Sequence, residues 1–127
     1  MLKSKDLLGI QELDEGELRV ILDNAANLKT IASRPVKKVP ALRGRTVANL
    51  FYEPSTRTRI SFELAARRLS ADFINFSAAT TAAGTGETLT DTAKAIEAMQ
   101  VDFLVVRHSM AGAAHQLARQ VRCSVIN

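Results

Sequence analysis

Apolar residues recur at helical spacing in some stretches of the chain and form short continuous runs in others. Residues 13–32 carry leucine, isoleucine and alanine at helical spacing behind Asp14, which suits a helix with that aspartate as its N-cap. We expect Leu22 and Leu28 to belong to the buried face of this helix. Residues 33–45 contain two prolines and five basic residues without periodicity, and are a predicted linker.

After this linker, apolar runs alternate with helical patterns. Strands are predicted over residues 46–52, 71–77, 101–107 and 123–127, and helices over residues 58–69, 88–99 and 112–121. Such alternation implies right-handed βαβ crossovers and a parallel sheet. The expected fold is therefore α/β: a three-layer, Rossmann-like or flavodoxin-like domain with helices on both faces of the sheet, truncated at the fourth strand.

Two segments carry narrower expectations. In the helix over residues 58–69, Ile60 and Leu64 recur at a spacing of four and are expected to face the core. Residues 78–86 are a low-complexity stretch of alanine, threonine and glycine, which we expect to be a mobile loop.

Composition narrows the class of protein. The apolar fraction of 46% suits a globular domain or part of one, and no apolar run approaches the roughly 20 residues that span a bilayer. The N-terminus lacks the apolar core of a signal peptide. A single cysteine, Cys123, excludes an intrachain disulfide. We therefore expect a cytoplasmic protein with a buried thiol and no membrane partner.

Charge permits an anionic partner without identifying one. The chain has 17 basic and 13 acidic residues, a net charge of +4. Its six aromatic residues offer little surface for stacking bases, so nucleic acid is not a predicted partner. A small phosphorylated metabolite fits better. No set of Asp, Glu or Cys has the spacing of metal ligands, and no metal or cofactor is expected.

The most informative stretch is residues 53–59, Glu-Pro-Ser-Thr-Arg-Thr-Arg, which joins the first strand of the predicted sheet to a helix. The first N–H groups of a helix lack partners, and the helix dipole there favours an anion. Ser55, Thr56 and Thr58 add three hydroxyls, and Arg57 and Arg59 add two guanidiniums, each of which matches phosphate oxygens two at a time. This junction predicts a phosphate-binding site.

A purely structural role for the same residues is the alternative. Serine and threonine are ordinary N-caps, and an arginine on a first turn is often solvated. Against this, Arg57 and Arg59 oppose the helix dipole unless an anion compensates them. The stretch lacks glycine, so it is neither a Walker loop nor a dinucleotide-binding fingerprint.

Parallel strands end at one edge of the sheet, and ligands bind beyond that edge. Arg107 and His108 end the strand over residues 101–107, so they are expected to face the loop that carries Arg57. For His108 a structural role and a catalytic role remain open. His115 lies within a predicted helix at no special spacing and is expected on the surface.

Residues 51–63 resemble the carbamoyl-phosphate signature of the aspartate and ornithine carbamoyltransferases. The resemblance continues in the expected order through residues 68–69, 75–77, 86–92, 106–108 and 112–114. Glu53-Pro54, the Gly-Glu-Thr-Leu stretch, and the Arg-His pair before Gly-Ala-Ala are more similar to the aspartate branch. The ornithine branch remains the alternative.

The resemblance implies roles for individual residues. Arg57 and Thr58 would grip carbamoyl phosphate, and Ser55 and Thr56 would line the same loop. Arg107 would polarise the carbamoyl carbonyl and contact the phosphate, so Arg57 and Arg107 are the implied catalytic residues. The reaction is transfer of the carbamoyl group to the amine of L-aspartate, a step of pyrimidine biosynthesis that rests on positioning and charge stabilisation.

The chain departs from the family in one loop. In the family, this loop reaches into the active site of a neighbouring subunit of a homotrimer. Thr85 stands where the family has a lysine, and Thr81 stands where it has a serine. Both positions belong to the implied substrate site. A cation near developing phosphate charge is worth about 2.7–4 kcal/mol by comparison with similar contacts. Three explanations account for the missing lysine: an engineered loop, a degenerate or regulatory homologue, or a non-catalytic assembly domain.

The chain also ends early relative to the family. It stops at Asn127, before the expected His-Pro-x-Gln motif and the whole aspartate-binding domain. We therefore expect residues 1–127 to be an incomplete carbamoyl-phosphate-binding domain that is catalytically silent alone and engages L-aspartate only with the missing domain. The implied assembly is a homotrimer, alone or with other pyrimidine-pathway subunits.

Overall fold

The computed structural model describes residues 1–77 and 88–127, in which four parallel strands form one sheet in the order β2-β1-β3-β4. The strands are β1 (Thr46–Phe51), β2 (Asp72–Ser77), β3 (Phe103–Arg107) and β4 (Ser124–Ile126). The helices are α1 (Glu15–Ala32), α2 (Thr56–Arg68), α4 (Leu89–Ala98) and α5 (Ala113–Gln120), preceded by a short 3-10 helix, η1 (Ile10–Glu12). This strand order is that of the flavodoxin-like sheets, one of the two arrangements left open by the sequence pattern.

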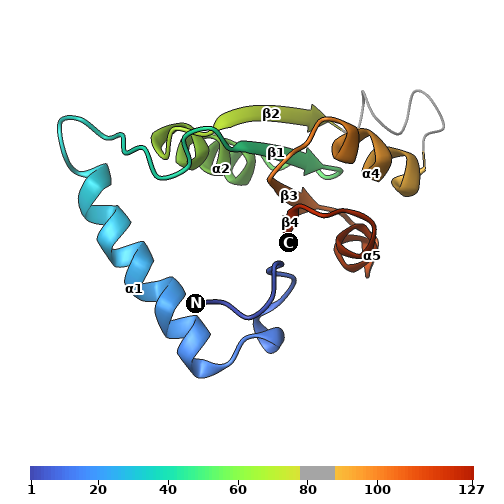
Figure 1. The fold of residues 1–127 in the computed structure, drawn as a ribbon, viewed down its shortest axis with the longest axis horizontal. Coiled ribbons are helices and arrows are strands. Elements are labelled where there is room, and N and C mark those ends of the chain that lie inside the picture. The colour runs from blue at the N-terminus through green and yellow to red at the C-terminus, as the bar shows by residue number, and fades with distance from the viewer. Residues whose placement is uncertain (78–87) are drawn as a thin grey trace.

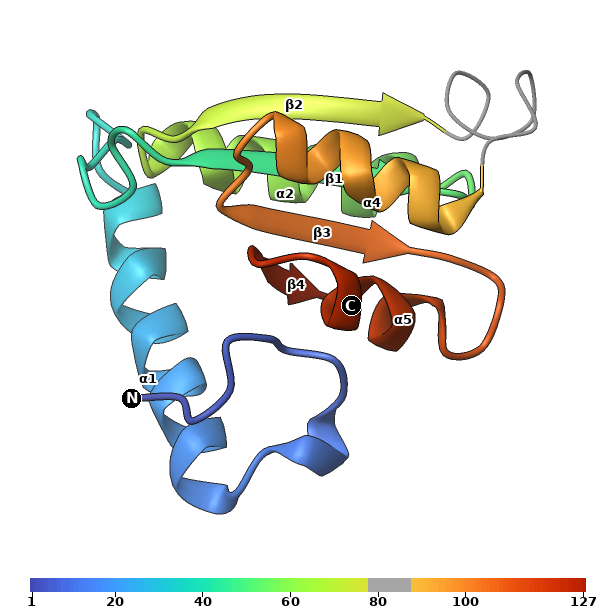
Figure 2. The same cartoon turned by 45° about the vertical axis from the view of Figure 1, so that its right-hand side comes forward.

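Alternate residues of β1 build two cores, one on each face of the sheet. Ala48 and Leu50 point to the face covered by α4 and α5, where Ile96 and Leu117 are fully buried. Val47 and Phe51 point to the other face, which α2 covers with Ala66. Figures 1 and 2 show these layers. The expected three-layer arrangement is confirmed.

Helix α2 packs on a different side from the one expected. Ile60 and Leu64 are 50% and 44% exposed, whereas Ala66 is buried and Phe62 packs beside it. The helix carries two apolar stripes, and periodicity alone does not say which one meets the sheet. The stripe with the aromatic ring lies against the sheet, where Phe73 and Phe103 complete the cluster.

Helix α1 begins as predicted but stands apart from the sheet (Figure 1). Asp14 accepts the N–H of Glu17 at 2.8 Å, and the Glu17 carboxylate accepts the N–H of Asp14 at 3.0 Å, which closes a capping box. The expected burial of its apolar stripe is wrong within the described residues, because Leu22 and Leu28 are 61% and 43% exposed.

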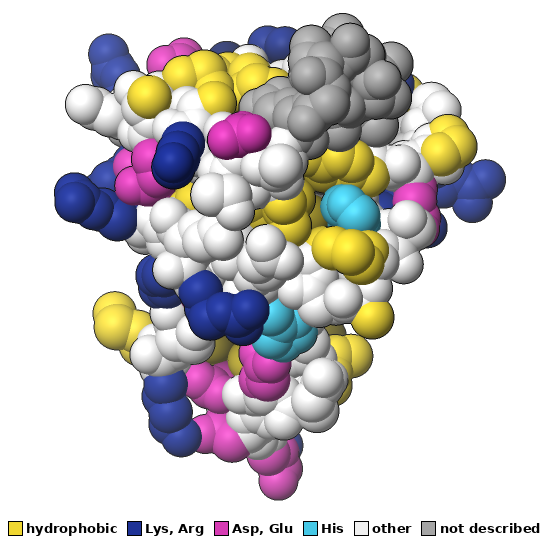
Figure 3. All heavy atoms as spheres, turned by 90° about the vertical axis from the view of Figure 1, so that its right-hand side faces the viewer, with side chains coloured by type: hydrophobic (Ala, Val, Ile, Leu, Met, Phe, Trp, Pro, Cys, Tyr) yellow, Lys and Arg dark blue, Asp and Glu magenta, His cyan; other side chains and the backbone are white. Residues whose placement is uncertain are grey.

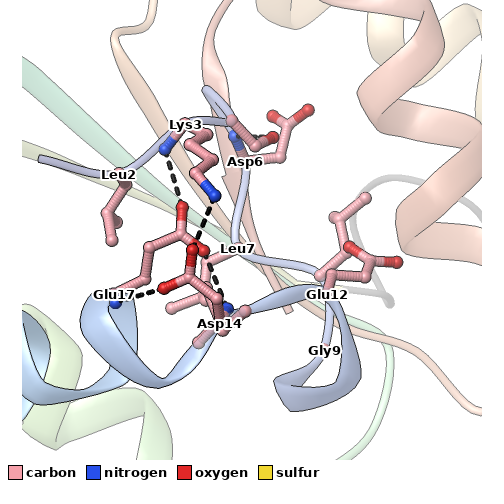
Figure 4. A pocket seen from close by; sticks show the side chains of 11 residues that line it. Leu2, Lys3, Asp6, Leu7, Gly9, Glu12, Asp14 and Glu17 are labelled. Carbon is pink, nitrogen blue, oxygen red and sulfur yellow. Dashed lines mark hydrogen bonds and ion pairs between the residues drawn. The ribbon is translucent and has the colours of Figure 1, made fainter.

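The segment before α1 folds back onto the start of that helix around a cavity of about 150 Å³ (Figure 4). The N–H of Lys3 donates to Glu17 at 2.8 Å, and its ammonium donates to Asp14 at 2.6 Å. These bonds lower the pKa of the Asp14 carboxyl, chiefly through the Lys3 side chain, and lower that of Glu17 through backbone N–H groups. The N–H of Leu7 donates to Val125, which ties the segment to β4.

Candidate functional site

The carboxyl ends of β1 and β3 meet at one edge of the sheet, at the right of Figure 2. The Tyr52 N–H donates to the Arg107 carbonyl at 2.7 Å, and the Arg107 Nε donates to the Glu53 carboxylate at 3.1 Å. The rings of Tyr52 and His108 lie 4.3 Å apart between centroids, at 47°. The expectation that Arg107 and His108 would face the loop after β1 is therefore confirmed.

A cavity of about 510 Å³ opens at this edge. Its walls come from the end of β1, the loop that follows, the first turn of α2 and the end of β2. The lining residues are Phe51, Tyr52, Glu53, Pro54, Ser55, Thr56, Arg59, Asn75 and Phe76. The cavity therefore combines hydroxyls, an amide, a carboxylate and a guanidinium.

The predicted site residues divide into two groups around this cavity. Ser55 and Thr56 line it. Arg57 is exposed and Thr58 is half-buried, and neither lines it. Arg107 does not line the cavity, but its guanidinium forms an ion pair with Glu53, which does. The other two predicted positions, Thr81 and Thr85, lie outside the described residues, as does the loop expected to be mobile.

Among residues 1–77 and 88–127, no side chain caps the start of α2. Ser55 occupies the N-cap position with φ −150° and ψ 79°, and its side chain makes no capping hydrogen bond. The first turn contains no acidic residue but carries Arg57 and Arg59. By contrast, Thr88 and Asp91 close a capping box at the start of α4. The hydroxyl of Ser55 and the first N–H groups of α2 are thus available to an anion.

His108 is fixed in one tautomer. Its Nδ1 accepts the N–H of Met110 at 2.9 Å, so the ring carries its proton on Nε2 when neutral. His115 lies on the surface, as expected, and its Nε2 is 2.9 Å from the Glu12 carboxylate. Figure 3 looks onto this edge of the sheet, where one histidine lies among hydrophobic side chains and the other beside an acidic one.

Of the nine residues that line the cavity, seven were not among the predicted catalytic or substrate-binding residues, and three of these seven are charged or carry an amide: Glu53, Arg59 and Asn75. Arg59 is the second guanidinium of the predicted phosphate-binding stretch, and Glu53 lies two residues before Ser55, so proximity in the sequence was a usable signal. Asn75 had a weaker signal, as a polar residue within an apolar strand. It lies opposite Asn49 in the parallel register of β2 and β1.

Away from this edge, the described residues offer few reactive groups. Cys123 is buried, and burial raises the pKa of its thiol to about 11. Within residues 1–77 and 88–127, no three His, Cys, Asp or Glu side chains form a group suited to a metal ion. No helix of that part of the chain is long and apolar enough to cross a membrane.

Comparison with known proteins agrees with this geometry. The family described as "Aspartate/ornithine carbamoyltransferase, carbamoyl-P binding domain" matches residues 5–127. The aspartate carbamoyltransferase catalytic subunit of Geobacter sulfurreducens is 58% identical over 125 residues, which cover 98% of this chain and 40% of that protein. Other catalytic subunits of the same name are 52–58% identical. The chain therefore spans about 40% of the length of these curated relatives.

Solved structures share the fold in both branches. The catalytic subunit of M. jannaschii aspartate transcarbamoylase is 34% identical and has a TM-score of 0.85, over 98% of this chain and 40% of that one. Ornithine carbamoyltransferase from Thermus thermophilus is 29% identical and has a TM-score of 0.86, over 99% of this chain and 42% of that one. The chain belongs to the aspartate/ornithine carbamoyltransferase family, within the domain described as carbamoyl-P binding.

Proposed function

We propose that the edge of the sheet beyond β1 binds carbamoyl phosphate. Ser55, Thr56, Arg57 and Thr58 bind its phosphate group, and Arg107 contacts the carbamoyl oxygen. The observation that carries this proposal is the uncapped start of α2, which offers hydroxyls and free N–H groups to a cavity at this edge. The description of the matching family supports the choice of ligand.

The positive charge of Arg107 determines how the proposed site would stabilise the reacting carbamoyl phosphate. The amine of the acceptor forms a C–N bond with the carbamoyl carbon, and phosphate leaves with the electron pair of the broken C–O bond. The amine gives up a proton as the C–N bond forms, and the departing phosphate takes that proton. Negative charge develops on the carbamoyl oxygen, where Arg107 would stabilise it. An incoming phosphate competes with Glu53 for Arg107, because that ion pair is half-exposed and open to exchange.

The complete protein, by this proposal, transfers the carbamoyl group to the amine of L-aspartate. The support is that relatives at 52–58% identity are named aspartate carbamoyltransferase catalytic subunits. In this proposal, residues 1–127 are the carbamoyl-phosphate-binding domain, and a further domain outside this chain binds aspartate. The protein is cytoplasmic and assembles as a homotrimer, in keeping with the exposed apolar side chains of Leu22 and Leu28 on α1 and of Ile60 and Leu64 on α2.

Calorimetric titration with phosphate and with carbamoyl phosphate tests the site. Arg57→Ala is expected to weaken binding about 30-fold, because it removes charge-assisted hydrogen bonds. Arg19→Ala is the matched control, since Arg19 is exposed on α1 and pairs with Glu15. Equal binding by the wild type and Arg57→Ala would reject the role of Arg57. A larger loss in Arg59→Ala would transfer the phosphate contact to Arg59, which lines the cavity.

An assay for ureido products tests the acceptor. The complete gene product is expected to form carbamoyl aspartate, and residues 1–127 alone are expected to form none. Citrulline formed from ornithine in place of carbamoyl aspartate would support the ornithine branch instead. Product formed by residues 1–127 alone would show that this part holds its own aspartate ligands.

Sedimentation equilibrium tests the assembly. A trimer is expected at tens of micromolar protein. A clean monomer of the complete gene product at that concentration would reject the proposed homotrimer without affecting the proposed ligand.

A further inference from the structure

We propose that Asn49 is a positioning residue that holds the first turn of α2 in place for anion binding. This inference rests on the proposed function. Asn49 lies in the middle of β1 and is fully buried. Its Nδ2 donates to the carbonyl of Arg59 at 3.2 Å. Its Oδ1 is buried and has no hydrogen-bond partner among the described residues.

Packing does not account for an amide at this position. Val47 and Phe51 flank Asn49 on the same face of β1 and belong to an apolar cluster with Ala66. A buried polar oxygen without a partner makes the folded state less favourable than an apolar side chain of similar volume would. What the amide adds is its single hydrogen bond to α2.

The backbone of a single residue, Arg59, connects the hydrogen bond from Asn49 to the start of the helix. The N–H of Arg59 donates to the carbonyl of Ser55 at 3.0 Å, and the carbonyl of Arg59 accepts from Asn49. The backbone of Arg59 therefore links the N-cap of α2 to the centre of β1. Asn75, opposite Asn49 in the strand register, lines the cavity together with Arg59.

The other two long helices fix their starts differently. Asp14 and Glu17 close a capping box at α1, and Thr88 and Asp91 close one at α4. Such a box occupies first-turn N–H groups with side-chain oxygens. In the described part of the chain no side chain caps α2, and the anchor from Asn49 leaves the first N–H groups of this helix for a ligand. Asn49 thus performs the positioning task of a cap from within the sheet.

The test compares Asn49→Leu with the wild type in the complete gene product, using inorganic phosphate as the probe. We expect the phosphate Kd to rise about fivefold through the loss of one hydrogen bond, while Tm stays equal or rises. Hydrogen exchange of the Arg59 amide should become faster, and that of the Arg67 amide should not change. Asn24→Leu is the control, because Asn24 also donates to a helix carbonyl but is exposed on α1.

Several outcomes would overturn the proposal. Unchanged phosphate affinity with unchanged exchange at Arg59 would show that Asn49 positions nothing. If Tm and the phosphate affinity fall together, Asn49 is a structural residue. The same conclusion follows if neither Asn49→Leu nor Asn49→Val folds. If the wild type binds no phosphate, the proposed function fails, and exchange at Arg59 alone decides whether Asn49 holds the first turn.

Discussion

The start of α1 and the start of α2 differ in how they use the N–H groups that every helix leaves without partners. At α1, Asp14 and Glu17 cap each other, and Lys3 pairs with both. At α2, the side chain of Ser55 makes no capping hydrogen bond with the described residues, and the first turn carries two arginines. The first arrangement is satisfied within the chain, whereas the second leaves hydrogen-bonding capacity and positive charge available.

By the proposed function, this difference separates a structural helix start at α1 from a ligand-binding one at α2. Both sites are polar and both border a cavity, so neither polarity nor a cavity distinguishes them. What distinguishes them is whether the polar groups already have partners. The polar groups of Lys3, Asp14 and Glu17 that line the cavity at α1 bond to one another (Figure 4), so these groups already have partners without a ligand.

The largest expected effect comes from a cation added at residue 85, which the resemblance to the family assigns to the substrate site. Thr85→Lys in the complete gene product should raise kcat/KM about 100-fold, because a cation stabilises charge that develops on phosphate. Steady-state assays of carbamoyl aspartate formation measure this. Thr30→Lys, which adds the same charge on exposed α1, is the control and should change nothing. Equal activity of Thr85→Lys and the wild type would mean that the site needs no lysine.

Removal of the Ser55 hydroxyl should separate binding from stability. We expect Ser55→Ala to raise the phosphate Kd about fivefold, since one hydrogen bond to the ligand is lost. Tm should hardly change, because this hydroxyl makes no capping hydrogen bond in the folded protein. Calorimetry and thermal melting give the two readouts. A large fall in Tm would indicate that Ser55 is a structural cap.

Removal of the cap at α1 should lower Tm and leave phosphate affinity unchanged, the opposite of the effect expected at Ser55. Asp14→Ala opens the capping box, and Tm is expected to fall by about 5 °C, as for other lost N-caps in small domains. Phosphate affinity should remain that of the wild type. Asp14→Asn keeps a side-chain acceptor, so its Tm should fall less than that of Asp14→Ala. Weaker phosphate binding in Asp14→Ala would show that the two helix starts are coupled.

The smallest expected effect is the pH dependence of the α1 start. The pKa values of Asp14 and Glu17 are lowered from 3.8 and 4.5, so their ionised forms stabilise the folded state at pH above those values. That stability should be lost as the pH falls below about 4 through the folded pKa values. Urea unfolding from pH 7 to pH 3 measures it. An Asp14→Asn variant with the same pH profile as the wild type would remove Asp14 as a contributor.

Much of the fold followed from local patterns. The alternation of apolar runs and helical spacing predicted the four strands and their parallel pairing, with ends that differ by one or two residues. Asp14 was predicted as an N-cap because residue type and position within four residues define a cap. The rule that parallel strands end at one edge also brought Arg107 to the loop after β1.

Partners at the site did not follow from those patterns. The side of α2 that meets the sheet was predicted wrongly, since Ile60 and Leu64 form a stripe as regular as the buried one. Glu53 as the partner of Arg107, and Asn75 as part of the cavity wall, depend on three strands lying side by side.

By itself, the sequence determined the elements, the fold class and the run of hydroxyls and guanidiniums at the edge of the sheet where the proposed site lies, because each depends on residues close together in the chain. Only the tertiary structure decided which polar groups are already paired and which are left for a ligand. Asn49 shows why: its one partner, the carbonyl of Arg59, comes within 3.2 Å only when α2 packs on β1. Hydrogen bonds act over a few ångströms, and packing sets those distances.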